Sequence, residues 1–170
     1  MLDMERFQSV LTKYIADFPR RWNEDQEYYK WEAVQHFQKT WDIEAKDFAV
    51  MLANALAKAS NLLLSIKYFP AGMVIELAKA EPENVRALFV SLFDEEQDVY
   101  ERIKIFKESI ETKLTKKSII SSQSSQSENA ILSAITTYLW LRYPDKYYSF
   151  KYNEAKIVST ELILNTNKTI

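Results

Sequence analysis

The chain has 170 residues, of which 47% are hydrophobic and 27% are charged, and its formal net charge is −2. This length and this composition indicate one globular domain and exclude a wholly disordered chain. The single glycine, the single histidine and the absence of cysteine exclude glycine-rich phosphate loops, disulfides, thiol nucleophiles and sites with several histidine ligands. The amino-terminal residues do not resemble a signal peptide, and no apolar run approaches the roughly 20 residues that span a bilayer. We therefore expect a soluble, cytoplasmic protein.

Apolar residues recur at helical spacing along most of the chain, which predicts a series of amphipathic helices. The expected helices cover residues 2–18, 28–41, 43–56, 70–78, 82–93, 94–110, 131–139 and 154–164. We expect Pro19 to end the first helix, because proline disfavours the helical conformation of the residue before it. Asn23 and Asp42 are expected to cap the second and third helices, since a short polar side chain accepts hydrogen bonds from the first amide groups.

The segment Lys146–Tyr152 has the aromatic, alternating pattern of a short strand. A lone strand cannot satisfy its own backbone groups, so it must pair with another extended segment. Three partners stay open: the apolar residues 62–69, residues 118–120, and a part of the protein that lies outside this sequence.

The predicted fold is therefore mostly α, a multi-helix bundle with a short strand element near the carboxyl terminus. We expect a helical bundle over residues 1–114 and a polar, serine-rich loop over residues 115–128. A helix–strand–helix segment over residues 129–165 is expected to pack on the bundle, so that the three parts form one domain.

Two local features bear on catalysis and on metal binding. A catalytic role for His36 needs a nucleophile and an orienting carboxylate from elsewhere in the chain, and we interpret this residue as an ordinary helix residue. The acidic run Asp94–Asp98 is explained by a helix start, where the helix dipole favours negative charge, whereas a metal site needs oxygen ligands from several directions. An enzyme is the least supported class of function.

Charge is unevenly distributed along the chain. Residues 1–100 carry a net charge of −6, whereas residues 101–170 carry +4. The cationic part also holds a dense group of aromatic residues between Trp140 and Tyr152, interleaved with lysine and arginine. Aromatic faces stack on bases and cationic side chains contact phosphates, so this segment predicts a nucleic-acid-binding surface.

Six residues make up the predicted DNA-binding site. They are Trp140, Arg142, Lys146, Tyr147, Lys151 and Lys156. We expect Arg142, Lys146 and Lys151 to contact phosphates. Tyr147 and Trp140 are expected to stack on a base or to enclose one.

The register of the predicted strand determines which of its side chains are available to DNA. If the strand buries Tyr148, Phe150 and Tyr152, it turns Tyr147 and Lys151 outward. The alternative is a packed strand with solvated lysines and no ligand.

Three segments of the chain resemble a known protein family: Tyr29–Lys79, Val85–Ile103 and Tyr138–Tyr152. The most specific sequence motifs are SNLL…YFPAGM in the first segment and YLWLRYPDKYY in the third. Together they resemble the amino-terminal region of McrB-type AAA+ NTPases, the motor subunits of modification-dependent restriction systems. The resemblance covers most of the chain between residues 25 and 165.

This resemblance implies a non-catalytic, amino-terminal domain that recognises DNA, in some relatives through a modified base. It also implies that the NTPase motor, which this sequence does not include, binds nucleotide and Mg²⁺, recruits a nuclease subunit and drives oligomerisation. We therefore expect DNA as the partner of this chain, and no cofactor, metal or membrane. The alternative is a protein-interaction module that binds a partner subunit, a phage component or itself, and an exposed apolar patch would favour it.

Overall fold

The computed structural model describes residues 3–23, 28–63, 71–116, 125–151, 155–157 and 159–160. These residues form helices, turns and irregular segments and include no strand, so the mostly α prediction is confirmed. The helices are α1 (Met4–Asn23), α2 (Tyr29–Thr40), α3 (Phe48–Ala55), α4 (Ala71–Ala80), α5 (Pro82–Phe93), α6 (Val99–Lys116) and α7 (Ser125–Arg142). The chain divides into two units: Lys30–Phe150 forms one, and Met1–Tyr29 with Lys151–Ile170 forms the other.

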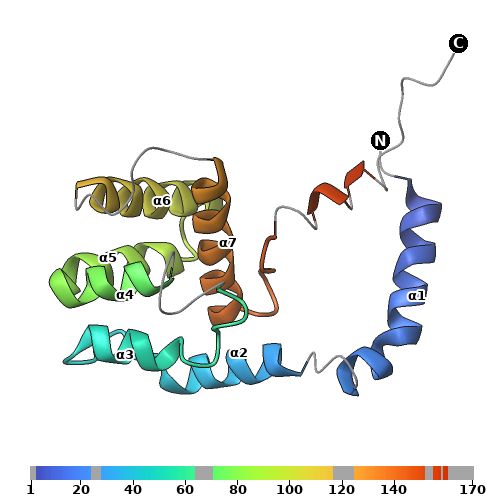
Figure 1. Cartoon of the computed structure of the whole chain (residues 1–170), viewed down its shortest axis with the longest axis horizontal. Helices are drawn as coiled ribbons and strands as arrows, with labels where there is room; N and C mark the ends of the chain where they lie inside the picture. The colour runs from blue at the N-terminus through green and yellow to red at the C-terminus, as the bar shows by residue number, and fades with distance from the viewer. Residues whose placement is uncertain are drawn as a thin grey trace, which may run out of the picture. The chain divides into compact units, whose positions relative to one another are not determined.

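The larger unit is a helical array centred on α5 (Figure 1). The helices α3, α4, α5 and α6 follow one another in the chain and each packs on the next, while α7 runs across them and contacts α5 and α6. Pro82 begins α5, where the missing backbone N–H would have no helical partner in any case. Glu81 is the single residue between α4 and α5, so these helices are held as close neighbours.

Aromatic side chains dominate the core of this unit. Phe89 of α5 is fully buried, and its ring centroid lies between 5.2 and 6.1 Å from those of five other rings. These rings belong to Trp41, Phe48, Phe93, Phe106 and Tyr138. Aromatic pairs at such distances stabilise by about 0.5–1.5 kcal/mol beyond the burial of their area. Phe89 therefore joins α5 to α3, α6 and α7.

The prediction that Pro19 ends the first helix is wrong, because α1 continues through Pro19 to Asn23. A proline this close to the carboxyl end removes one backbone hydrogen bond but leaves the turn that follows it intact. Asn23 Nδ2 donates to the carbonyl oxygen of Pro19 at 2.9 Å. Asn23 is thus the last residue of α1 rather than the cap of α2, which begins at Tyr29.

Two other predicted helix starts lie several residues too early. Asp42 precedes a turn, and the side chain that caps α3 belongs to Asp47, whose Oδ1 accepts from the backbone N–H of Val50 at 3.0 Å. The helix expected from Asp94 begins at Val99, after Asp98. Both corrections have one cause: a run with several acidic residues offers several caps, and tertiary packing selects among them.

The predicted strand does not form in the part of Lys146–Tyr152 that the structure describes, residues 146–151. In place of a second strand, side chains of α7 hydrogen-bond to this segment. The N–H of Phe150 donates to Thr136 Oγ1 at 3.0 Å, and the hydroxyls of Ser149 and Thr137 lie 2.7 Å apart. Tyr152 and two of the proposed pairing segments, residues 64–69 and 118–120, lie outside the described residues.

The segment predicted as a serine-rich loop, residues 115–128, contributes to two helices. Residues 115–116 end α6 and residues 125–128 begin α7, while residues 117–124 lie outside the described part of the chain. Of the closing helix predicted over residues 154–164, residues 155–157 and 159–160 are described and are helical.

We predict that Phe89→Ala lowers the free energy of unfolding by about 3–5 kcal/mol, because the cavity removes the ring contacts among four helices. Urea denaturation followed by tryptophan fluorescence measures this change. Val90→Ala, at a neighbouring position that is 52% exposed, is the matched control and should change stability by less than about 0.5 kcal/mol. Equal effects of the two substitutions would contradict a core centred on Phe89.

Candidate functional site

The six residues of the predicted DNA-binding site are shared between the two units. Trp140 and Arg142 lie in the last turns of α7, and Lys146 and Tyr147 lie in the segment that follows, all within the unit Lys30–Phe150. Lys151 and Lys156 are exposed and belong to the other unit. The structure therefore brings at most four of the six into one compact unit.

Trp140 is not available to a base. Its side chain is only 7% exposed, and its ring packs edge-on against Trp31 of α2 with 5.9 Å between the ring centroids. The contact attaches α7 to α2, which is a packing role. Trp140 therefore has no accessible ring face for the predicted stacking on a base or enclosure of one.

Tyr147 is half-buried and connects the carboxyl-terminal segment to the junction of α5 and α6. Its hydroxyl accepts from Arg102 Nη2 at 2.8 Å and donates to Glu95 Oε1 at 2.8 Å. Arg102 is itself buried, and its Nη1 donates to the carbonyl oxygen of Leu92 at 2.8 Å. Because the Tyr147 hydroxyl satisfies two charged groups, a base that displaced it would leave a buried guanidinium with one partner fewer.

The positive charge of Lys146 is balanced within the unit by Glu95. The ammonium forms an ion pair and a hydrogen bond with Glu95 Oε2. Lys146 first and the Tyr147 hydroxyl second hold the pKa of the Glu95 carboxyl below its usual value, and Glu95 raises the pKa of the Lys146 ammonium. Contact between Lys146 and a phosphate must therefore compete with an internal carboxylate.

Arg142 is engaged mainly with its neighbour in the chain. Its guanidinium carbon lies 5.3 Å from the ring centroid of Tyr143, within the range of a cation–π contact. The hydroxyl of Tyr143 donates to the carbonyl oxygen of Phe93 at 2.8 Å. Arg142, Tyr143 and Tyr147 thus take part in fixing the carboxyl-terminal segment against the end of α5.

The structure also shows residues that the sequence interpretation missed. Tyr148 was expected to be buried, but it is 81% exposed while Tyr147 turns inward. Glu95 was attributed to a helix start, but it binds Lys146 and Tyr147. The sequence did contain an indication that Arg102 is buried. This residue lies four positions before Phe106 on the apolar stripe of α6, where a cation requires internal hydrogen-bond partners.

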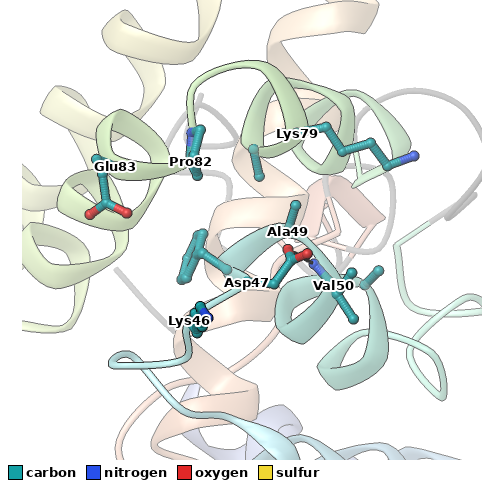
Figure 2. Close-up of a pocket in the computed structure, with 10 residues that line it drawn as sticks. Lys46, Asp47, Ala49, Val50, Lys79, Pro82 and Glu83 are labelled. Atoms are coloured by element: carbon teal, nitrogen blue, oxygen red, sulfur yellow. Dashed lines mark hydrogen bonds between the residues drawn. The ribbon is translucent and has the colours of Figure 1, made fainter.

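A pocket of about 590 Å³ opens between the start of α3, the end of α4 and the start of α5 (Figure 2). Its lining is mostly apolar, and Asp47, Lys79 and Glu83 have partners among other residues. Asp47 caps α3 through the N–H of Val50, and Lys79 points away from the pocket and pairs with Glu76 at 2.6 Å. Ligand sites combine apolar lining with a few converging polar groups, and the described residues here do not provide them.

An exposed apolar surface lies on α1. None of the twenty residues of this helix is buried, and the exposed fractions of its large apolar side chains range from 37% to 62%. We call this surface the α1 apolar face, formed by Met4, Phe7, Val10, Leu11, Tyr14, Ile15 and Phe18. A contiguous apolar surface of this kind is typical of a binding site for protein or membrane.

Three observations on the described residues bear on metal binding, acid–base chemistry and membrane insertion. No group of three or more histidine or carboxylate side chains is placed to hold a metal ion there. His36 Nε2 lies 2.8 Å from the carbonyl oxygen of Asn54, which makes it a hydrogen-bond donor between α2 and α3. Among the described helices, none has the length and apolar character needed to cross a bilayer.

Comparison with known proteins yields no relative for this chain. No family model, no curated protein and no solved structure matches it. Function must therefore be argued from the surfaces described above.

We predict that Tyr147→Phe lowers the free energy of unfolding by about 1–3 kcal/mol, because it removes the hydroxyl shared by buried Arg102 and Glu95. Tyr148→Phe removes an exposed hydroxyl and serves as the control, with an expected change below about 0.5 kcal/mol. Urea titration of both variants measures the difference. Identical midpoints for the two variants would show that the Tyr147 hydroxyl is not a structural link.

We predict that Lys146→Gln raises the pKa of Glu95 toward its usual value, since the Lys146 hydrogen bond is the main cause of the lowering. A carboxyl whose pKa is lower in the folded chain stabilises it above the unfolded pKa, and this contribution is lost as pH falls through the folded pKa. The wild-type protein should therefore lose more stability than the variant on acidification below the usual glutamate pKa. Carbon-detected NMR titration of Glu95 measures the shift directly.

The control for this titration is Lys79→Gln, which removes a lysine paired with Glu76 on α4. It should leave the pKa of Glu95 unchanged. A Glu95 pKa that is insensitive to Lys146→Gln would contradict the ion pair.

Proposed function

We propose that this chain is a non-catalytic binding domain of a McrB-like restriction NTPase and that the α1 apolar face is its protein-binding surface. One observation carries the proposal: α1 exposes seven large apolar side chains on one face and buries none of its residues. The assignment to a McrB-like parent protein depends on the sequence resemblance. Nucleotide and Mg²⁺ belong in this proposal to the motor, in the cytoplasm, and the nuclease subunit is the protein partner that the α1 apolar face would bind.

The exposed area on α1 is large for a surface without a ligand. An aromatic side chain buries about 150–250 Å² when it is covered, and the α1 apolar face includes the rings of Phe7, Tyr14 and Phe18 beside four aliphatic side chains. The accessible apolar area is therefore on the order of several hundred Å², the range in which patches mark interaction sites.

The helical state of α1 also favours a partner. Helices in proteins derive most of their stability from packing of the apolar face rather than from intrinsic propensity. Within the helix, Asp17 pairs with Arg20 and Arg21 at 2.8 and 2.9 Å, but exposed pairs of this kind contribute little. Covering the apolar face by another protein would supply the missing packing.

We predict that Leu11→Asp weakens capture of the nuclease subunit of the same restriction system at least about tenfold, because it places an unpaired carboxylate in an apolar contact. The measurement is a pull-down by the full 170-residue chain after digestion of DNA. Val90→Asp, at an exposed apolar position on α5, is the control and should leave capture unchanged. If the Leu11→Asp chain captures the nuclease subunit as well as the wild type does, α1 is not the binding surface.

A second candidate function, DNA recognition, is favoured by the exposure of Tyr148. This ring is 81% exposed, and Lys146 of the same unit lies two residues before it in the chain. An exposed ring beside a cation suits stacking on a base with a phosphate contact next to it. In this version of the hypothesis Tyr148 replaces Tyr147 and Trp140 as the stacking residue.

The test is fluorescence anisotropy with plain and cytosine-modified duplexes at several salt concentrations. If DNA binds, affinity should fall as salt rises, because binding releases cations from the duplex and this release is less favourable at higher salt. Tyr148→Ala should weaken binding about tenfold or more, as expected for one stacked base, whereas Tyr100→Ala, an exposed ring on α6, should not. Absence of affinity for every duplex would leave protein binding as the function.

A further inference from the structure

The apolar side chains of α1 follow the heptad spacing of a coiled coil. Met4, Leu11 and Phe18 occupy every seventh position, and Phe7 and Tyr14 lie three residues after the first two. This alternation of three and four residues keeps one seam in contact with a partner helix along its whole length. Val10 and Ile15 flank the same seam and widen it.

We propose that the α1 apolar face pairs in antiparallel orientation with the same face of a second copy of this chain. This inference rests on the proposed function, because it concerns the same protein-binding surface. It identifies α1 of a second copy as a helix that binds there. The seam is self-complementary. One antiparallel register places Phe7 opposite Phe18 of the second copy and Leu11 opposite Tyr14 of the second copy. The two-fold symmetry of the pair repeats both contacts with the copies exchanged.

The charges of α1 favour an antiparallel pair over a parallel one. The first turn contains Glu5 and Arg6 and follows Asp3, a net charge of −1, and the last two turns contain Asp17, Arg20 and Arg21, a net charge of +1. Antiparallel pairing brings the acidic start of one helix to the basic end of the other and opposes the two helix dipoles. Parallel pairing places like charges together at both ends.

The size of the seam indicates a weak dimer. A helix of twenty residues is about 30 Å long and about 10 Å wide. One face covered along this length buries a few hundred Å² per copy, below the roughly 800 Å² per partner of a standard stable interface. Association should therefore depend on protein concentration in the micromolar range or above it.

The main test is the mass of the full 170-residue chain in solution, measured by sedimentation equilibrium from about 1 μM to about 1 mM. The wild type should shift from monomer to dimer across this range, and Leu11→Asp should raise the dissociation constant at least tenfold. Val90→Asp should dimerise like the wild type. Tryptophan fluorescence melting of the Lys30–Phe150 core verifies that each variant is folded.

Orientation is tested by cross-linking, which the natural absence of cysteine makes unambiguous. In an antiparallel pair Met4 lies opposite Arg21 of the second copy, so a mixture of Met4→Cys and Arg21→Cys chains should form a mixed disulfide on mild oxidation. Met4→Cys alone should form none, because the two sulfur atoms lie at opposite ends of the pair. Cross-linking of Met4→Cys to itself would overturn the antiparallel arrangement.

The remaining outcomes separate this inference from the proposed function. A chain that stays monomeric at every concentration, or a dimer that is insensitive to Leu11→Asp, overturns self-pairing. If α1-dependent capture of the nuclease subunit persists in either case, the protein-binding function stands with a different partner. If that capture is also absent, both proposals fail.

Discussion

The buried guanidinium of Arg102 controls how the carboxyl-terminal part of the larger unit is arranged. A charged group in a protein interior must be paired or hydrogen-bonded, and Arg102 finds its partners in the carbonyl of Leu92 and the hydroxyl of Tyr147. Tyr147 is thereby drawn inward, and its hydroxyl and Lys146 converge on Glu95. The segment after α7 is held by these contacts and by side chains of α7, so it requires no partner strand.

This arrangement changes the interpretation of the basic, aromatic carboxyl-terminal sequence. Trp140, Tyr147 and Lys146, which a pattern of rings and cations assigns to a nucleic acid, have internal partners in Trp31, Arg102 and Glu95. The exposed features lie elsewhere. They include the ring of Tyr148, and the α1 apolar face, which belongs to the other unit.

Much of the helical pattern was predictable because burial follows periodicity. Val85, Phe89 and Leu92 recur on one stripe of the sequence, and all three are fully buried in α5. Helix ends were less predictable, since α1 continues through Pro19 and α3 starts at Asp47 instead of Asp42. Local rules rank residues as caps or breakers, but the free energy of packing a turn against its neighbours outweighs differences of about 1 kcal/mol between them.

The amino-acid sequence by itself determined the helical class, the apolar stripe of α5 and the amphipathic character of α1, because these depend on the spacing of residues near one another in the chain. Only the tertiary structure decided whether Tyr147 or Tyr148 faces solvent. That choice depends on the hydrogen bond between Tyr147 and Arg102, which is 45 residues away in the chain. The alternation of side chains in a short segment does not by itself say which of the two neighbours points inward. Whether an apolar helix face is covered is likewise a property of the assembled protein, because the spacing of apolar residues does not say what packs on them.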